Sequence, residues 1–218
     1  GDLAERVYSS RLLGLEPSLV LHGGGNTSVK VRERNILGEE EEILYVTGSG
    51  QDLATIEADG FAPVRIERLL ALARLDSLSD TQMGIELDAA KTDPSAPAPS
   101  VEAILHAILP ARFVDHTHAD AVLSVANTPS GEERVRELYG DAAVVVPYVM
   151  PGFELARLVA ELFPAEATER TIGMVLLHHG VFSLGATARE AYERMLELVT
   201  RAEEYLAERG AWRIVFSG

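Results

Sequence analysis

Two histidines separated by one residue end an apolar, β-type segment at residues 113–118. Because alternate side chains of a strand point to the same face, His116 and His118 should project together, roughly 6–7 Å apart at the backbone. Two imidazoles in this arrangement suit a single metal ion. A tetrahedral catalytic zinc takes a third protein ligand and keeps one position open for water or substrate. His178 and His179 are the candidates for that third ligand.

A carboxylate lies ahead of this strand, on a short helix that we expect to begin at Ser100 and to end before Pro110. Ser100 is a good helix N-cap, and Glu102 would lie in the first turn, where the helix dipole favours a negative charge. On the helix alone, that charge effect explains Glu102 better than the alternative, an acid–base role beside a metal. His106 would share the helical face of Glu102, and we expect a packed or hydrogen-bonded core histidine rather than a ligand.

Two glycine-rich turns carry hydroxyl and amide side chains. In the first, residues 23–28, three glycines precede Asn26, Thr27 and Ser28 and lead into a β-type run; the second, residues 47–50, reads Thr-Gly-Ser-Gly at the end of the next strand. Glycine permits positive φ angles and lets a ligand approach the backbone closely. One such turn is more often a plain hairpin than an anion site. Two at the ends of neighbouring strands would converge on one anion, which makes the pair the stronger signal.

The whole chain has 218 residues, 47% of them hydrophobic, which is enough for one full-sized domain with a substantial core. Its formal net charge is −15, and Lys and Arg are scattered along the sequence. We therefore expect neither a nucleic acid nor a membrane as a partner, because both present negative charge. A small anionic substrate is still compatible, since backbone N–H groups can bind phosphate locally.

Cysteine is absent, which excludes disulfides and thiolate chemistry and leaves His and carboxylate side chains as the metal ligands. No apolar run approaches the length of a membrane span, and the first residues lack the basic and then apolar regions of a secretory leader. These features predict a cytoplasmic protein.

Helices and strands are predicted in alternation, hence an α/β fold in three layers whose sheet has substantial antiparallel pairing. Residues 171–185 form a long apolar run; as one central strand it would place His178 and His179 on opposite faces, so that only one of them joins a given metal. Residues 76–88 look turn-like, and 93–99, with three prolines, look like a rigid loop. Helices are expected at 3–14, at the end of 62–75, at 119–126, 131–139 and 153–163, and from a capping box at 187–190 to Gly210; the other strands follow the first glycine turn and occupy 43–47, 113–118 and 142–152.

Several common catalytic motifs are missing from the sequence, namely GxGxxG, GxxxxGK[ST], GxSxG and HExxH. Nucleotide binding by the common loops, serine hydrolysis and zincin chemistry are therefore disfavoured. Five of the six histidines fall in two expected strands and in the helix before the first of them. A lone buried histidine is usually structural, whereas His-x-His on a strand with a distant third His favours a metal site.

These motifs in combination resemble one family, the class II aldolase/adducin family, which includes zinc-dependent fuculose-phosphate and rhamnulose-phosphate aldolases and ribulose-phosphate 4-epimerases. The resemblance covers nearly the whole chain and implies a single domain at 1–218 with a three-layer αβα fold and a largely antiparallel central sheet. Residues 101–121 are most similar to the aldolase half of rhamnulose-1-phosphate aldolases fused to a short-chain dehydrogenase, so we expect the N-terminal part of a longer chain. The matching motifs are Gly25-Asn26-Thr27-Ser28, Thr47-Gly48-Ser49-Gly50, Pro99-Ser100-Val101-Glu102, His116-Thr117-His118, Pro147-Tyr148 and His179-Gly180.

The resemblance also implies roles for individual residues. His116, His118 and His179 match the ligands of Zn²⁺ or another divalent metal, and Glu102 matches the acid–base carboxylate. Tyr148 matches a tyrosine that, in the aldolases, reaches the active site of a neighbouring subunit. The positions that hold the substrate phosphate and adjoining oxygens are matched by Gly25, Asn26, Ser49, Gly50 and Ser100. Val101 replaces a serine that is frequent in the aldolases, which leaves the exact substrate open.

The resemblance implies a zinc-dependent aldolase that cleaves a ketose 1-phosphate, such as L-rhamnulose or L-fuculose 1-phosphate, into dihydroxyacetone phosphate and an aldehyde. It also implies a homotetramer with sites between subunits. The alternatives are an epimerase, dehydratase or decarboxylase of the same family, and a non-catalytic, adducin-like interaction module. That module lacks the metal histidines, which are present here. A metallohydrolase is a third alternative, but no adjacent Asp/His cluster supplies the extra ligands that it would need.

Overall fold

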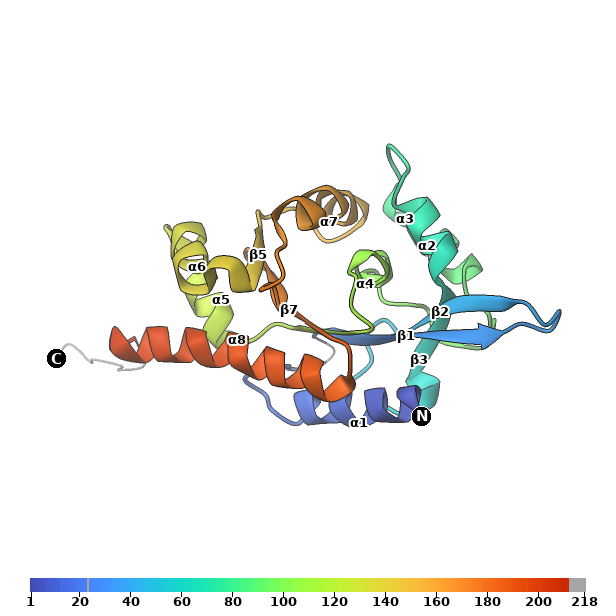
Figure 1. Cartoon of the computed structure of the whole chain (residues 1–218), viewed down its shortest axis with the longest axis horizontal. Coiled ribbons are helices and arrows are strands. Elements are labelled where there is room, and N and C mark those ends of the chain that lie inside the picture. The colour runs from blue at the N-terminus through green and yellow to red at the C-terminus, as the bar shows by residue number, and fades with distance from the viewer. Residues whose placement is uncertain (23, 212–218) are drawn as a thin grey trace.

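The computed structural model describes residues 1–22 and 24–211 and shows one seven-stranded sheet with helices on both faces (Figure 1). Gly23 of the first glycine turn and the end of the chain from Trp212 onward lie outside the described residues. The strands are β1 (Asn26–Arg34), β2 (Glu40–Thr47), β3 (Phe61–Arg65), β4 (Phe113–Thr117), β5 (Ala143–Val146), β6 (Gly173–Leu176) and β7 (Gly180–Gly185). The helices are α1 (Asp2–Gly14), α2 (Ile66–Leu72), α3 (Asp80–Ala89), α4 (Ala103–Ile108), α5 (Asp120–Ala126), α6 (Gly131–Tyr139), α7 (Phe153–Glu166) and α8 (Ala188–Glu208), with 3₁₀ turns η1 (Ala58–Gly60) and η2 (Gly140–Ala142).

The strand order across the sheet is β3-β2-β1-β4-β7-β6-β5. Strands β5 and β6 run parallel, and the other neighbouring pairs are antiparallel. Strand β4 is therefore the middle strand, with β1 on one side and β7 on the other. The predicted three-layer α/β fold with a largely antiparallel sheet is confirmed.

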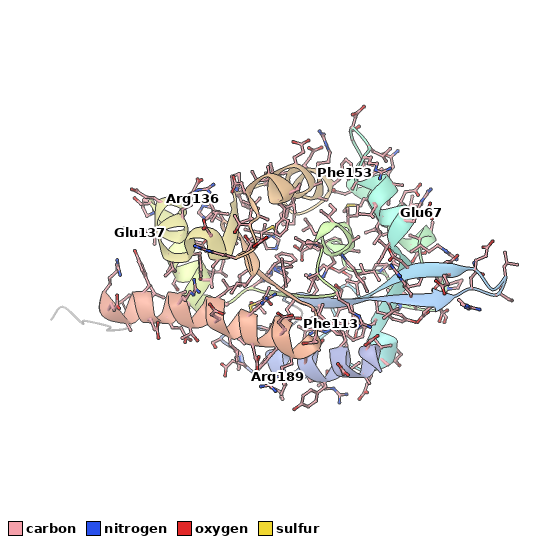
Figure 2. The ribbon with its side chains drawn as sticks, viewed as in Figure 1. Glu67, Phe113, Arg136, Glu137, Phe153 and Arg189 are labelled. Carbon is pink, nitrogen blue, oxygen red and sulfur yellow. The ribbon has the colours of Figure 1, made fainter. Side chains whose placement is uncertain are left out.

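The core is divided by the sheet, because successive side chains of each strand point to opposite faces. On one face, Val114 packs in a cluster with residues of α2, α3, α4 and α7; on the other, residues of α1, α5, α6 and α8 pack against the sheet. In Figure 1, α4 and α7 lie above the sheet and α1 and α8 below it. Figure 2 shows Phe113 beside the N-terminal end of α8 and Phe153 at the start of α7, on opposite sides of the sheet.

Helix α8 follows the prediction closely. Thr187 Oγ1 accepts the backbone N–H of Glu190 at 3.1 Å, and the Glu190 carboxylate accepts the N–H of Ala186 rather than that of Thr187. Gly210, with φ +65°, lies just past the helix end, as expected. Within residues 1–22 and 24–211, no helix has both the length and the apolar character of a membrane span. The residues of α8 buried against the sheet recur at intervals of three or four: Ala188, Ala191, Met195, Leu198, Val199, Ala202 and Leu206.

Two segments differ from the prediction in type. Residues 80–89 form α3 instead of a turn, because Ser79 and Gln82 make a capping box and Met83 and Leu87, one helical turn apart, are buried. The apolar run 171–185 is a hairpin instead of one strand: β6 and β7 pair with Leu176 opposite Gly180, and His178 has φ +59° in the turn. Both strands are buried on both faces, so each is almost wholly apolar, and the short polar segment His178-His179 between them forms the turn.

Prolines set two further differences. The expected strand 142–152 is limited to β5, because Pro147 has no N–H to continue the ladder. Helix α7 does not stop at Pro164, which lies in its last turn. A proline near the end of a helix disturbs few backbone hydrogen bonds, so the helix continues to Glu166.

A buried ion pair joins α1 to the middle strand. Arg6 Nη1 lies 2.5 Å from Asp115 Oδ1, and both side chains are fully buried. Arg6 also donates to the hydroxyls of Ser9 (2.8 Å) and Ser10 (3.2 Å) and, at 3.4 Å, to the carbonyl of Ser28. A charge so far from water is tolerated only when it is paired and hydrogen-bonded, so removing either partner leaves the other uncompensated.

We therefore expect Arg6→Met to lower the free energy of unfolding by about 3–5 kcal/mol, because Asp115 is then left buried without a counter-charge. Urea denaturation followed by circular dichroism measures this change. Arg112→Met is the matched control: Arg112 pairs with Asp2 of α1 just ahead of β4, but these side chains are 48% and 35% exposed. It should cost less than about 1 kcal/mol. Equal losses in the two variants would contradict the role of burial.

Candidate metal centre

Three histidines from two distant segments of the chain meet at one end of the sheet. His116 is in β4, His118 follows that strand, and His179 lies in the turn between β6 and β7. One ring nitrogen of each lies within 4.8 Å of the others, and the Nε2 atoms of His116 and His118 are 3.1 Å apart. The cause is the antiparallel pairing of β4 with β7, in which Thr117 lies opposite Val181 and the end of β4 meets the start of β7.

The histidines are in the protonation state that a metal requires. Burial and the neighbouring His179 and His118 rings lower the pKa of His116 well below its ordinary value, and burial together with His118 lowers the pKa of His179 to about 4. Burial also lowers the pKa of His118. The rings are therefore neutral near pH 7, and neutral imidazole is the metal-binding form. This donor set fits a divalent metal ion.

The orientation of His116 is set by contacts on two sides of its ring. Nδ1 donates to the carbonyl of Val181 at 3.2 Å, which leaves the Nε2 lone pair for the cluster. The ring also stacks on Phe182, with centroids 4.1 Å apart and an angle of 21° between the planes. His178, by contrast, points away and contacts Asn127 Oδ1 at 3.1 Å. The sequence-based choice of His179 rather than His178 thus agrees with this geometry.

Gly180 makes room for two of these rings. A Cβ at this position would lie 2.8 Å from Cε1 of His116, 3.0 Å from Cδ2 of His118 and 2.5 Å from the carbonyl oxygen of Thr117. Carbon atoms do not pack this closely, so any side chain at residue 180 would displace the histidines or the end of β4.

Glu102 lies against the histidine cluster. Its Oε2 is 3.4 Å from His116 Nε2, and its Oε1 is 3.3 Å from His179 Nε2. The side chain is buried, and burial raises its pKa to about 7, with the hydrogen bond from Asn26 acting in the opposite direction. Oε1 has no hydrogen-bond partner among the described residues. A carboxylate with a pKa near neutrality and a free oxygen is suited to moving a proton beside a metal.

The local structure at Glu102 differs from the prediction. Helix α4 starts at Ala103, and Glu102 is its N-cap residue instead of a member of its first turn. Ser100 does not cap the helix; its Oγ accepts the N–H of Glu102 at 3.2 Å, and its carbonyl accepts the N–H of Ala103 at 3.0 Å. This turn folds the carboxylate back onto the sheet. The charge effect of a helix start is therefore not a sufficient explanation for Glu102.

The two glycine turns lie side by side, as expected from neighbouring strands. Ser28 pairs with Val46, so the start of β1 and the end of β2 share one edge. The segment that leads to Glu102 joins them, because Ser49 N–H donates to Ala98 (2.9 Å) and Ser100 N–H donates to Thr47 (3.1 Å). Asn26 and Ser100 contact Glu102, Ser49 is bonded to the segment that leads to it, and Gly25 and Gly50 have φ angles of +76° and +74°. Their binding of a phosphate stays a prediction.

Tyr148 lies outside the histidine cluster of its own chain. Its side chain is exposed and follows β5, and its ring meets the edge of His178 at 5.9 Å between centroids. Its hydroxyl contacts Met150 Sδ at 3.9 Å. The expectation that Tyr148 acts in the site of a neighbouring subunit stays a prediction.

A buried hydrogen-bond chain behind Glu102 was only partly expected. His106 is fully buried and bonds to Ser28 and Asn26, which confirms the expectation of a hydrogen-bonded core histidine. The side chain of Asn26, one of the residues expected to bind the substrate phosphate and adjoining oxygens, contacts His106 and Glu102. Its binding of substrate stays a prediction. The one signal in the sequence was the four-residue spacing of Glu102 and His106.

Comparison with known proteins gives matches over nearly the whole chain. The family described as "Class II Aldolase and Adducin N-terminal domain" matches residues 4–206. The uncharacterized oxidoreductase YuxG of Bacillus subtilis (strain 168) is 37% identical over 215 residues, which cover 98% of this chain and 31% of YuxG. The chain therefore spans about a third of the length of this curated relative.

Solved structures agree with the same fold. The N-terminal class II aldolase domain of a conserved protein from Thermoplasma acidophilum is 44% identical, with a TM-score of 0.87 over 94% of each chain. A sugar-phosphate aldolase from Thermotoga maritima gives a TM-score of 0.67 over 96% of this chain and 95% of its own, at 17% identity. At that identity, the second similarity concerns the fold alone.

Gly180→Ala should weaken the binding of a divalent metal by at least about 10-fold, because the added methyl group displaces His116 and His118. Titration with Zn²⁺ against a chromophoric chelator measures the affinity, and circular dichroism verifies the fold. Gly84→Ala is the control: this glycine is in α3, and a Cβ there meets nothing within 4 Å. An unchanged Zn²⁺ affinity in Gly180→Ala would show that metal binding does not require the close packing of His116 and His118 against residue 180.

Proposed function

This chain belongs to the class II aldolase and adducin family, and we propose that it is a zinc-dependent aldolase. The proposed reaction is the cleavage of a ketose 1-phosphate, such as L-rhamnulose or L-fuculose 1-phosphate, into dihydroxyacetone phosphate and an aldehyde. The observation that carries the proposal is the carboxylate of Glu102, which lies 3.4 Å from His116 and 3.3 Å from His179. An interaction module needs no such group, whereas a carbon–carbon lyase needs a base beside its metal.

His116, His118 and His179 would hold the metal. A Zn²⁺ ion held by three neutral imidazoles keeps its full charge and would polarise the carbonyl and hydroxyl oxygens of the substrate. Glu102, through its free Oε1, would carry the proton that is exchanged at the hydroxymethyl carbon of the dihydroxyacetone phosphate half. Tyr148 of a neighbouring subunit would carry the proton at the aldehyde oxygen. No lysine is needed for this chemistry.

The phosphate would be bound at the two glycine turns. The backbone N–H groups of Ser49 and Ser100 are already used by Ala98 and Thr47, so these serines would bind the phosphate through their hydroxyls. Ser100 Oγ accepts from Glu102 N–H, which leaves its own O–H free to donate. The residues that bind the phosphate and carry the acid–base carboxylate, Ser100 and Glu102, would then belong to one short, rigid segment. The backbone N–H groups and positive φ angles of Gly25 and Gly50 suit close approach of an anion.

Epimerases, dehydratases and decarboxylases of the family are the second candidates, since the same metal site would serve them. The adducin-like module is disfavoured by the presence of all three histidines with Glu102. We also propose a homotetramer in which Tyr148 completes the neighbouring site. Tyr148 and Met150 are 52% and 70% exposed on one loop, as expected for side chains that a second subunit would cover.

The first test combines metal analysis with an assay of retro-aldol cleavage of both sugar phosphates. We expect about one zinc per chain, lost together with activity in His116→Ala. Glu102→Gln should keep the metal and lower kcat by about 10²–10⁴-fold, because it removes the proton carrier alone. Metal binding without cleavage of any ketose phosphate would favour the epimerase, dehydratase or decarboxylase alternatives. Failure to bind any divalent metal would refute the proposal that this chain is a metal-dependent enzyme.

The second test addresses the shared site. Co-expressed Glu102→Gln and Tyr148→Phe chains should form mixed oligomers that regain activity, because one subunit supplies the carboxylate and its neighbour the tyrosine. Each variant alone should be nearly inactive. If Tyr148 acted within its own subunit, every site in the mixture would lack one group and no activity would return.

A further inference from the structure

A chain of four polar side chains runs from the interior of the domain to Glu102. Ser28 Oγ lies 2.7 Å from His106 Nδ1, His106 Nε2 contacts Asn26 Oδ1, and Asn26 Nδ2 contacts Glu102 Oε2. Exposure falls from 8% at Asn26 to zero at Ser28 and His106, so water does not compete for these bonds.

The backbone around this chain is fixed on both sides. Asn26 and Ser28 are in β1, where they pair with His116 and Val114 of β4. His106 is in α4, one turn after Glu102, and its N–H donates to the Glu102 carbonyl at 3.1 Å. The side chains therefore have little freedom except for the orientation of the Asn26 amide and the choice of the protonated nitrogen in His106.

These two choices depend on each other. His106 is neutral, because burial and the positive charges of Lys30 and Arg6 lower its pKa to about 3, so the ring carries one N–H. With the proton on Nε2, the ring donates to the Asn26 carbonyl and accepts the Ser28 hydroxyl on Nδ1. The Asn26 amide nitrogen then donates to the Glu102 carboxylate. Every contact in the chain pairs a donor with an acceptor.

The opposite arrangement does not satisfy the same atoms. With the proton on Nδ1, His106 would donate to Ser28 Oγ and would need the Asn26 amide nitrogen at Nε2. The Asn26 carbonyl would then face Glu102 Oε2, and the hydrogen bond that Asn26 Nδ2 donates to that oxygen would be lost. A buried polar atom without a hydrogen-bond partner costs free energy of folding. The favoured arrangement is therefore the first, with the proton of His106 on Nε2.

We propose that His106 is a positioning residue: its Nε2–H, held by Ser28, orients the Asn26 amide so that its nitrogen faces and holds Glu102 beside the metal ligands. Its importance for turnover rests on the proposed function. Asn26 is then a clamp on the acid–base residue, and Oε1 of Glu102, which makes no hydrogen bond among the described residues, is the oxygen left for the substrate.

The direct test reads the tautomer without any turnover. Protein labelled with ¹⁵N-histidine is studied by long-range ¹H–¹⁵N NMR, metal-free and with Zn²⁺, and the His106 signals are assigned by their loss in His106→Gln. We expect Nε2 to carry the proton and Nδ1 to be the unprotonated nitrogen, between pH 6 and 8. A proton on Nδ1, or a charged ring, would overturn the proposal.

The kinetic test uses matched variants. Gln at residue 106 can place an amide N–H near the position of Nε2, whereas Leu has similar size and no donor. We expect His106→Leu to lower kcat by about 10–100-fold with little change in KM or Zn²⁺ content, and His106→Gln to restore most of it. The rate at which the hydroxymethyl proton of dihydroxyacetone phosphate exchanges in D₂O should fall in the same order: wild type, then His106→Gln, then His106→Leu. Equal kcat in wild type and a folded His106→Leu would overturn the proposal.

The two proposals can fail separately. If the wild-type protein neither cleaves a ketose phosphate nor exchanges that proton, the proposed function fails, and the NMR tautomer still decides how Asn26 is held. If the wild type is active and His106→Leu loses Zn²⁺ or its cooperative thermal transition, the residue is structural and the positioning role is refuted.

Discussion

The alternation of side chains along β4 is the constraint on which the site depends. Asp115 points to α1, where Arg6 neutralises it, and the next residue, His116, points to the opposite face and the histidine cluster. A shift of the strand by one residue would bury an unpaired carboxylate among imidazoles and remove a metal ligand. The buried ion pair therefore contributes more than stability, since it favours the register of β4 that directs His116 into the histidine cluster.

Glu102 has neighbours of two kinds, residues that position its carboxylate and residues of the histidine cluster. On one side, the turn at Ser100 and the chain from His106 through Asn26 fix the carboxylate; on the other side are His116 and His179. The glycines allow this density of polar groups, because Gly180 leaves space for two rings and Gly25 takes a φ angle that other residues avoid. The site is thus built from local turns joined by strand pairing.

Strand periodicity and helix capping made much of this arrangement predictable from the sequence. The spacing of His116 and His118 and the capping signal at Thr187 act within a few residues, so the sequence displays them. The hairpin at 171–185 was missed because both strands are buried and almost wholly apolar, so that His178-His179 was interpreted as part of one long strand although these residues form the turn. The bonds from Asn26 to His106 and Glu102 join positions far apart in the chain, and only the pairing of β1 with β4 brings them together.

The order of strands in the sheet also governs when the metal ligands can assemble. Strands β1, β4 and β7 lie side by side, yet they come from the beginning, the middle and the end of the chain. Such non-local pairing forms slowly, because loop entropy is lost before the contacts stabilise the structure. During synthesis a chain that has not yet paired β7 offers only His116 and His118, a two-ligand site. A metal ion bound by all three histidines would consequently be captured late in folding, and it would stabilise the finished sheet rather than guide its assembly.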